Sequence, residues 1–299
     1  NENHAAPSTG EVSDNLGREN IIDFQPLGAS KEKQSVEIVT VPKLDGQRNQ
    51  KNVAITINAK LILKILSKVY SKVRITEITT RECLTKLAKR KPNLVFSGVK
   101  YFEFNGDQIW LNDFLELHNI PYIGSNHAAL DREHNKGLAK SLVKKAGIVT
   151  ADYVVVKTSG VSAHNHLRMA YPVFVKPVIG GDSVGIDELS LVFNREQLDV
   201  KRLDREKVTK VKNKTLHKKL SDLGKSAFAA LGGRSFGRID IKLCAKGLPH
   251  FVEANLMPGL SKGYFYRFCV INLGMTYDDM ILLLCSNRIN SSGEGKKTA

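Results

Sequence analysis

Hydrophobic residues between positions 53 and 126 follow two spacings, which alternate along the chain. Short apolar runs of the kind found in strands are separated by segments in which apolar residues recur every three or four positions, the spacing of a helix face. Strands that alternate with helices are typical of a parallel sheet covered by helices. We therefore predict a small open parallel α/β domain over residues 51–126. Its predicted elements are strands at 53–57, 73–78 and 94–96, and helices at 62–69, 81–89 and 110–117.

Residues 127–290 have a different pattern, in which isolated strands and helices precede a β-hairpin. Lys246-Gly247 separates two alternating apolar segments and suits a tight turn. The predicted elements are helices at 136–146, 216–230 and 277–285, and strands at 153–157, 172–177, 237–243 and 250–255. Residues 1–50 predict an irregular extension with one strand at 36–41, and residues 291–299 predict a polar basic tail. The predicted fold class is α/β (α+β).

The composition fits a globular protein in a reducing compartment. The 299 residues are 42% apolar, which is enough for packed cores. No apolar run approaches the ~20 residues that span a bilayer, and the opening NENHAAPSTG lacks the basic and apolar parts of a secretory signal. Cys83, Cys244, Cys269 and Cys285 form no CxxC pair, so free thiols are expected. These features predict a cytoplasmic protein with no membrane partner, and they leave a monomer or a homodimer open.

The formal net charge of +15 suggests an anionic ligand. Ten of the 45 Lys and Arg residues lie between Lys201 and Lys225, where only Asp204, Glu206 and Asp222 oppose them. Such a run is most often one solvated face of a helix, although it could also attract polyphosphate or nucleic acid. No aromatic residues interleave with it, so the stacking platform of single-strand-binding proteins is missing. Charge therefore favours an anionic ligand without naming one, and nucleic acid is the weaker choice.

The predicted hairpin carries candidate metal-binding chemistry. If its turn is centred near Lys246, Asp240 lies opposite Glu253, and strand alternation places Asn255 on the same face. Two carboxylates and an amide oxygen are ligands that suit Mg²⁺, which takes few protein ligands and completes its shell with phosphates and water. Arg238 shares this face and could bind a developing anion. The alternative is that all four residues are ordinary solvent-facing hairpin positions.

Two lysines favour phosphate binding. Lys176 ends an apolar strand directly before a glycine-rich turn that contains Gly180, Gly181 and Ser183, and the amides of such a loop can wrap phosphate oxygens. Lys136 opens a helix, where the helix dipole and the ammonium both favour an anion. A glycine-rich run alone is more often a plain turn, and no Walker motif is present. The order of these motifs along the chain is more specific than any one of them.

In that order, the motifs resemble those of the ATP-grasp enzymes, and within them D-alanine–D-alanine ligase and its relatives. The resemblance covers roughly residues 50–290 and implies an ATP-grasp core of two subdomains at 127–290, preceded by the small α/β domain. The resembling segments are Pro92–Phe96, Ile109–Ser125, Asn135-Lys136, Ala146-Gly147, Pro172–Pro177, Gly237–Asp240 and Glu253–Gly259.

The resemblance implies a ligase that uses ATP and two Mg²⁺ ions. ATP would phosphorylate a small carboxylate substrate, and an amine would then displace phosphate from the acylphosphate; amino acids or similar molecules are the implied substrates. Lys136 and Lys176 would contact the ATP phosphates, beneath the loop with Gly180, Gly181 and Ser183. Asp240, Glu253 and Asn255 would hold the Mg²⁺ ions, and Arg238 and the Gly259 backbone would stabilise the tetrahedral intermediate.

Several positions depart from the ligase pattern. The family's first-strand loop carries a Glu that binds the first amino acid's ammonium, whereas Ile57–Lys60 runs straight into a helix. Asp182 and Tyr264 stand where the ligases have serines on the substrate side. These departures argue against D-alanine as the substrate.

A family segment is also absent between Gln197 and Lys207. By the resemblance, it includes a strand that binds adenine and ribose and a loop that covers the substrate. Either the protein has lost this segment, or residues are missing between 198 and 207. A non-catalytic ATP-grasp relative, kept for nucleotide binding or as a scaffold, is therefore the second interpretation. A basic nucleic-acid-binding protein is the third.

Overall fold

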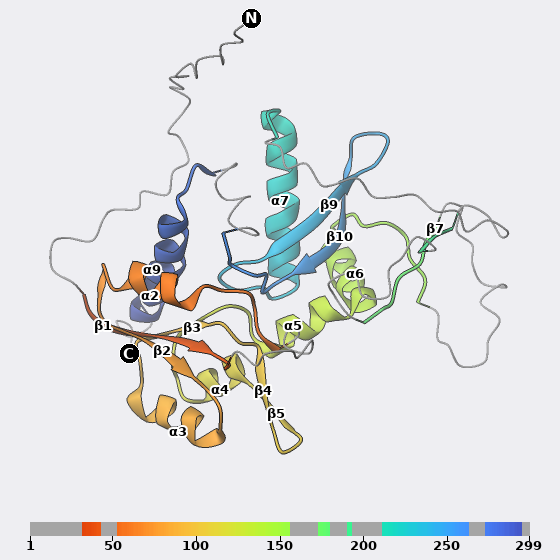
Figure 1. Ribbon diagram of the computed structural model, residues 1–299. Coiled ribbons are helices and arrows are strands. Elements are labelled where there is room, and N and C mark those ends of the chain that lie inside the picture. Colours follow the sequence, from red (N-terminus) through yellow and green to blue (C-terminus); the bar gives the residue numbers. More distant parts are fainter. Residues whose placement is uncertain are drawn as a thin grey trace, which may run out of the picture.

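The computed structural model describes residues 32–42, 53–155, 173–179, 190–192, 211–262 and 273–294. A parallel sheet with its helices forms one unit, and a hairpin backed by a long helix forms the centre of the other (Figure 1). The arrangement is the expected mixture of helices and strands with a parallel sheet. None of the helices in these ranges is long and apolar enough to cross a membrane.

The parallel sheet has four strands in the order β2-β1-β3-β6. They are β1 (Glu32–Thr40), β2 (Tyr70–Glu77), β3 (Leu94–Ser97) and β6 (Tyr122–Ile123). β1 pairs in parallel with both β2 and β3, and β3 pairs in parallel with β6. This confirms the parallel sheet predicted from the alternating pattern.

The central position of β1 corrects two predictions. The expected strand at 53–57 does not form, and only Ala54 makes an isolated bridge there, to Val99. Its place is taken by β1, which confirms the strand predicted at 36–41 but belongs to the sheet and not to an irregular extension; its Val36, Ile38 and Val39 are fully buried. The sheet unit therefore begins at Glu32 and not at residue 51. Ile57–Lys60 is thus only the end of the connection that follows the first strand, so the missing ammonium contact was inferred from part of that connection.

Helices cover both faces of the sheet, and a small hairpin extends from one end of it (Figure 1). The helices α2, α3 and α4 lie where they were predicted, but Leu117 at the end of α4 is 78% exposed and does not join the core. The hairpin was not predicted, and Trp110, the last residue of β5, had been included in the expected helix at 110–117. The elements are α2 (Ala59–Leu66), α3 (Arg81–Arg90), α4 (Leu111–Leu117), β4 (Tyr101–Phe104) and β5 (Asp107–Trp110).

The start of α3 creates an unusual thiol. Cys83 is the third helical residue. The Thr80 hydroxyl donates a hydrogen bond to its sulfur and the Thr79 hydroxyl lies 3.7 Å from it; hydrogen bonds with the backbone and side chains of these two residues lower the pKa of the thiol to about 6. The Sγ of Cys285 is fully buried, and burial raises its pKa. Cys83, Cys244 and Cys285 are all free, as predicted.

We therefore expect iodoacetamide at pH 7 to alkylate Cys83 well before Cys244, because the thiolate is the nucleophile and both side chains are partly exposed. Cys285 should react only after unfolding. Peptide mass spectrometry over a time course measures these rates, with Cys83→Ser as the control. Equal rates for Cys83 and Cys244 would contradict the lowered pKa.

The second unit contains the hairpin and the helices that pack around it. Helix 136–146, the long helix and both hairpin strands were predicted, whereas α5 was not. The described residues of the predicted strand 153–157, which are 153–155, form no strand. The elements are α5 (His127–His134), α6 (Lys136–Lys145), β7 (Val173–Phe174), β8 (Leu191–Val192), α7 (Lys214–Ala230), β9 (Arg238–Leu243) and β10 (Pro249–Asn255).

The last helix, α9 (Tyr277–Glu294), belongs to the sheet unit. It packs against α2, β3 and β6, and buries Tyr277, Ile281 and Cys285 in the core shared with the sheet. It was expected to end near Cys285 and to close the core of the second domain. Its actual position returns the chain to the first unit and extends into the expected polar tail.

A buried polar chain fixes the hairpin relative to the sheet. Ser97 Oγ donates to Asn112 Oδ1 at 2.6 Å, and Asn112 Nδ2 donates to the Ser125 carbonyl at 2.7 Å. Ser125 Oγ in turn donates to the carbonyl of Leu256 at 3.1 Å. Buried polar groups that are fully paired hold one arrangement, because every alternative leaves a group without a partner. The residues that follow β10 are thereby held against the end of the sheet.

Candidate active site

The hairpin brings the predicted metal ligands together. β9 and β10 are antiparallel, with Asp240 opposite Glu253 and Arg238 opposite Asn255. Residues directly opposite in an antiparallel pair share a face, and so do residues two apart in one strand. All four side chains therefore lie on one face, as the sequence predicted.

A β-bulge is responsible for this pairing. Near the turn, Phe251 lies opposite Ile241, and the register then shifts between Phe251 and Glu253. Without the shift, Glu253 would lie opposite Ile239 on the apolar face. An extra residue in one strand re-aims the side chains that follow it, and bulges are common next to active sites. The bulge at Val252 therefore places the Glu253 carboxylate beside that of Asp240.

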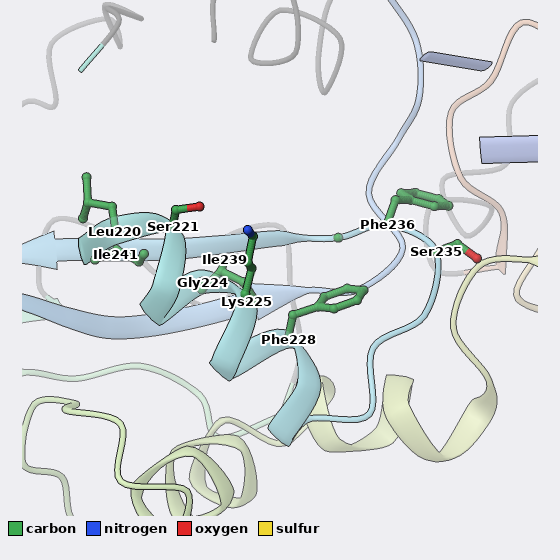
Figure 2. A pocket seen from close by; sticks show the side chains of 10 residues that line it. Leu220, Ser221, Gly224, Lys225, Phe228, Ser235, Phe236, Ile239 and Ile241 are labelled. Carbon is green, nitrogen blue, oxygen red and sulfur yellow. The ribbon is translucent and has the colours of Figure 1, made fainter. Parts of the chain in front are cut away.

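The other face of the hairpin packs against α7. Ile239 and Ile241 face Leu220 and Phe228 across a pocket of about 380 Å³ (Figure 2). Its lining is mainly apolar, with Lys225 and two serines at its margin. Because alternate residues point to opposite faces, this pocket lies on the far side of the hairpin from the carboxylates. The pocket is not part of the candidate site. The packing of α7 against this face covers the back of the hairpin and so supports the site.

Each hairpin carboxylate is paired with a cation of the chain. Arg238 binds Asp240 through two hydrogen bonds, from Nε at 2.8 Å and from a terminal nitrogen at 3.0 Å. Lys176 Nζ donates to Glu253 Oε2 at 3.3 Å. The Lys176 side chain is 19% exposed, so this ion pair is partly shielded from water. Lys176, two residues after the end of β7, thus reaches the hairpin face, as a phosphate-binding lysine would have to.

Lys136 lies in the same site. Its amide donates to the Val178 carbonyl at 2.9 Å, which joins the start of α6 to the segment after Lys176. Burial lowers the pKa of the Lys136 ammonium, the charge of Lys176 lowers it further, and the charge of Glu253 raises it. The predicted convergence of Lys136 and Lys176 is therefore present.

A third lysine, Lys140, was not predicted. Its Nζ donates to the Ala151 carbonyl at 3.0 Å and lies 5.4 Å from the centre of the Tyr153 ring. Burial lowers the pKa of this ammonium, and the charge of Lys176 lowers it further. Residues four apart lie on the same face of a helix, so the spacing from Lys136 was the signal that could have revealed it.

The turn after β10 is held at both ends. Asn255 Oδ1 accepts a hydrogen bond from the Met257 amide at 3.2 Å. The Leu260 amide donates to the Thr56 carbonyl at 2.9 Å, and a Cβ at Gly259 would lie 3.3 Å from the Thr56 Cβ. That spacing is tight for any side chain, so glycine allows the close approach of the two segments. The backbone at Gly259 is thus held against Thr56, four residues after Asn255, and its predicted role stays a prediction.

Glu133 in α5 is a second residue that was missed. Its carboxylate accepts a hydrogen bond from the amide of Leu256, directly after Asn255. Burial raises the pKa of Glu133 to about 7, while the Leu256 hydrogen bond and the charges of Lys100 and Arg238 act in the opposite direction. An additional carboxylate therefore lies within electrostatic reach of Arg238.

Some predicted residues lie outside the described ranges. They are Gly180, Gly181 and Ser183 of the glycine-rich turn, together with Asp182, Tyr264 and the chain between 198 and 207. Their roles stay predictions.

The oxygen donors fit Mg²⁺ in kind and in number. Asp240 and Glu253 are directly opposed, and Asn255 adds an amide oxygen on the same face. In the described part of the chain no three His, Cys, Asp or Glu side chains cluster as metal ligands. Mg²⁺ needs only one or two carboxylates when phosphates and water complete its shell. The residues present suit a metal that arrives with a polyphosphate.

Comparison with known proteins identifies the class. A family model described as the D-ala D-ala ligase C-terminus matches residues 142–210 and 203–286. The chain is 25% identical to the D-alanine–D-alanine ligase of Streptococcus pyogenes serotype M2 over 268 residues, which cover 69% of this chain and 77% of the relative.

Solved structures agree with this match. The D-alanine–D-alanine ligase of Bacillus anthracis, solved in complex with ATP, has a TM-score of 0.63 at 14% identity and covers 88% of this chain and 99% of its own. The VanG D-Ala:D-Ser ligase of Enterococcus faecalis has a TM-score of 0.58 at 16% identity, with 85% and 99% covered. The fold is therefore the ATP-grasp fold. Within that class, the chain is a D-alanine–D-alanine ligase-like protein.

Proposed function

We propose that this protein is an ATP- and Mg²⁺-dependent ligase that joins a small carboxylate to an amine through an acylphosphate. The observation that carries the proposal is the face of the hairpin, where two opposed carboxylates, Arg238, Lys136 of α6 and Lys176 after β7 converge. The D-alanine–D-alanine ligase-like sequence and fold support an ATP-dependent reaction.

The lysines would hold the nucleotide. The charge of Lys176 contributes to the lowered pKa of the Lys136 ammonium, and a polyphosphate between the two lysines would offset that repulsion. When Lys176 turns to a phosphate, Glu253 is released from its ion pair. Lys140, one helical turn after Lys136, would add positive potential, although its ammonium donates a hydrogen bond to the Ala151 carbonyl.

The hairpin face would hold the reacting groups. Bound Mg²⁺ would neutralise phosphate charge, and Asp240, Glu253 and Asn255 are the residues that would hold it. Arg238 would bind the oxygens that gain charge as the amine attacks, since a fixed guanidinium favours a developing anion. The Gly259 backbone would line the same space, because its contact with Thr56 fixes it there.

Amino acids or similar small molecules are the proposed substrates. Asp182 and Tyr264 in place of the ligase serines still argue against D-alanine. The expectation based on Ile57–Lys60 no longer does, because β1 ends at Thr40 and Ile57–Lys60 is only the last part of the connection to α2 and the first residues of that helix. A substrate ammonium therefore stays compatible with the sheet unit.

A non-catalytic nucleotide-binding protein is the second candidate. The alignment with the streptococcal ligase is 268 residues long, whereas 69% of the 299 residues here is about 206, so the relative has residues without a counterpart. The two matched ranges of the family model join at 203–210, directly before α7. Both observations agree with a segment missing from the nucleotide pocket.

A phosphate-release assay separates the two candidates. The protein is incubated with ATP, Mg²⁺ and pairs of amino acids of both chiralities, and inorganic phosphate and the joined product are measured. Release that depends on an amino-acid pair supports the ligase. Tight ATP binding without release under every pair supports the non-catalytic relative.

The phosphate grip gives a separate prediction. Lys176→Ala should weaken ATP binding by about tenfold to a hundredfold, because a charged hydrogen bond is worth about 1.5–3 kcal/mol. Calorimetric titration measures the affinity. The matched control is Lys144→Ala on α6. The Lys144 side chain is 70% exposed and its Nζ lies 4.0 Å from Asp152 Oδ1, so this variant should bind ATP as the wild type does. If the two variants had equal affinities, Lys176 would be an ordinary structural lysine.

A further inference from the structure

Glu133 links three parts of the protein. It belongs to α5, its carboxylate accepts a hydrogen bond from the Leu256 amide, and the charges of Lys100 and Arg238 act on it. Lys100 comes from the sheet unit, and Arg238 from the hairpin. The carboxylate is therefore held in place beside the hairpin face without contributing to the pairing of β9 with β10.

Arg238 competes with a metal ion for Asp240. Its guanidinium occupies both carboxylate oxygens of Asp240, at 2.8 and 3.0 Å. A metal ion on Asp240 binds one of those oxygens and repels the guanidinium, which favours a turn of Arg238 away from Asp240. A partly buried cation that loses its anion is costly unless another anion replaces it.

We propose that Glu133 is a positioning residue, whose carboxylate is the second anionic partner to which the Arg238 guanidinium turns when Asp240 binds a metal ion. The inference rests on the metal site of the proposed function. In the metal-free state Arg238 is paired with Asp240. In the loaded state Asp240 faces the metal and Arg238 faces Glu133, so each carboxylate keeps a cationic partner. The turn also carries the guanidinium toward the Leu256–Gly259 backbone, where the substrate is expected.

The Leu256 hydrogen bond suits Glu133 to this role. One carboxylate oxygen is fixed by a backbone amide, so the side chain does not need to be ordered when Arg238 arrives, and pre-organisation lowers the entropic cost of a new contact. Asp240 and Glu133 then compete for one guanidinium. The relative strength of the two ion pairs sets how readily the Asp240 carboxylate becomes available to a metal ion.

A double-mutant cycle tests the exchange. Mn²⁺ binding is measured by electron paramagnetic resonance of the free ion, in the presence of a non-hydrolysable ATP analogue, for the wild type, Glu133→Gln, Arg238→Ala and the double variant. Gln keeps the acceptor for the Leu256 amide and removes only the charge. We expect Glu133→Gln to bind Mn²⁺ about tenfold more weakly, since couplings of this size are typical of residues in one charge network.

The other two variants give the discriminating result. Arg238→Ala should bind Mn²⁺ at least as tightly as the wild type, because Asp240 has lost its competitor. In that background Glu133→Gln should have no further effect. If Glu133→Gln weakens binding by the same factor with and without Arg238, Glu133 acts only as a general negative charge, and the exchange is overturned.

Two controls complete the test. Glu103→Gln, an exposed position on the β4–β5 hairpin, should leave Mn²⁺ binding unchanged. Thermal unfolding of each variant shows whether the fold is kept, and Arg238→Ala tests the competition even if Glu133→Gln unfolds. A wild type that binds ATP analogue but no Mn²⁺ would overturn the metal site as well as this role. Binding in the wild type with an additive cycle would overturn this role alone.

Discussion

Replacement of Glu253 by Gln is expected to abolish ligase turnover while the fold stays intact. Glu253 lies opposite Asp240, and the bulge at Val252 aims it at the proposed metal site. Glutamine keeps the size of the side chain and loses the charge that would hold Mg²⁺. A metal-held charge contributes several kcal/mol to the transition state, so kcat/KM should fall by about a thousandfold or more.

Stability should change little in the same variant. The Glu253 side chain is 37% exposed and forms an ion pair with Lys176 at 3.3 Å. Ion pairs with this exposure contribute about 0–1 kcal/mol. Phosphate release measures turnover and chemical denaturation measures the free energy of unfolding, with Glu103→Gln as the matched substitution. Turnover above a tenth of the wild-type value would exclude Glu253 as a metal ligand.

The pairing of Asp240 with Glu253 could be predicted because hairpins have few degrees of freedom. A glycine with positive φ, Gly247 at +71°, closes the turn, and strand alternation then fixes which residues share a face. The prediction nevertheless depended on a feature that no residue signals. A turn centred at Lys246 pairs Phe251 with Ile241, and only the bulge brings Glu253 to Asp240. Val252 is an ordinary strand residue, so its extra position follows from tertiary packing.

The prediction of a strand at 53–57 in the place that β1 takes was wrong for a similar reason, since tertiary packing decides which segment joins the sheet. Both segments are short, apolar and rich in β-branched residues, and periodicity alone cannot rank them. In the folded sheet, β1 lies at the centre because it pairs with β2 on one side and with β3 on the other. Ile55, in the other segment, is buried at the end of β3, where its amide donates to the Gly98 carbonyl at 3.1 Å.

Glu133 and Lys140 show which site residues a sequence conceals. Neither stands in a recognisable motif, and α5 itself was not predicted. Glu133 matters because Leu256, more than a hundred residues away in the chain, presents its amide to it. Lys140 matters because burial and Lys176 act on its ammonium. Contacts of this kind arise only when distant elements pack together.

The largest stability effect is expected at an ion pair far from the candidate site. Glu37 on β1 is 3% exposed, and Arg90 donates to both of its oxygens at 2.7 Å. Thr76 donates a third hydrogen bond at 2.6 Å. Burial raises the pKa of the Glu37 carboxyl, but the hydrogen bonds and the charges of Arg90 and Arg74 outweigh it, so the pKa lies below its ordinary value.

Arg90→Met is therefore expected to lower the free energy of unfolding by about 3–5 kcal/mol, because it leaves a buried carboxylate without its cation. The same substitution at Arg81, whose partner Asp107 is 74% exposed, should cost no more than about 1 kcal/mol. The double variant Glu37→Gln/Arg90→Met should recover part of the loss. Chemical denaturation of the four proteins at pH 7 measures these differences.

The pH dependence gives an independent test of the same pair. In the wild type the folded-state pKa of Glu37 is below its ordinary value of 4.5, so its contribution is present above pH 4.5 and is lost as the pH falls through the folded value. In Arg90→Met, burial without Arg90 should raise that pKa above 4.5. The carboxyl then destabilises the fold increasingly as the pH rises from 4.5. The gap in unfolding free energy between the two proteins should therefore narrow in acid, and a gap that is constant with pH would show that Arg90 stabilises the fold by packing alone.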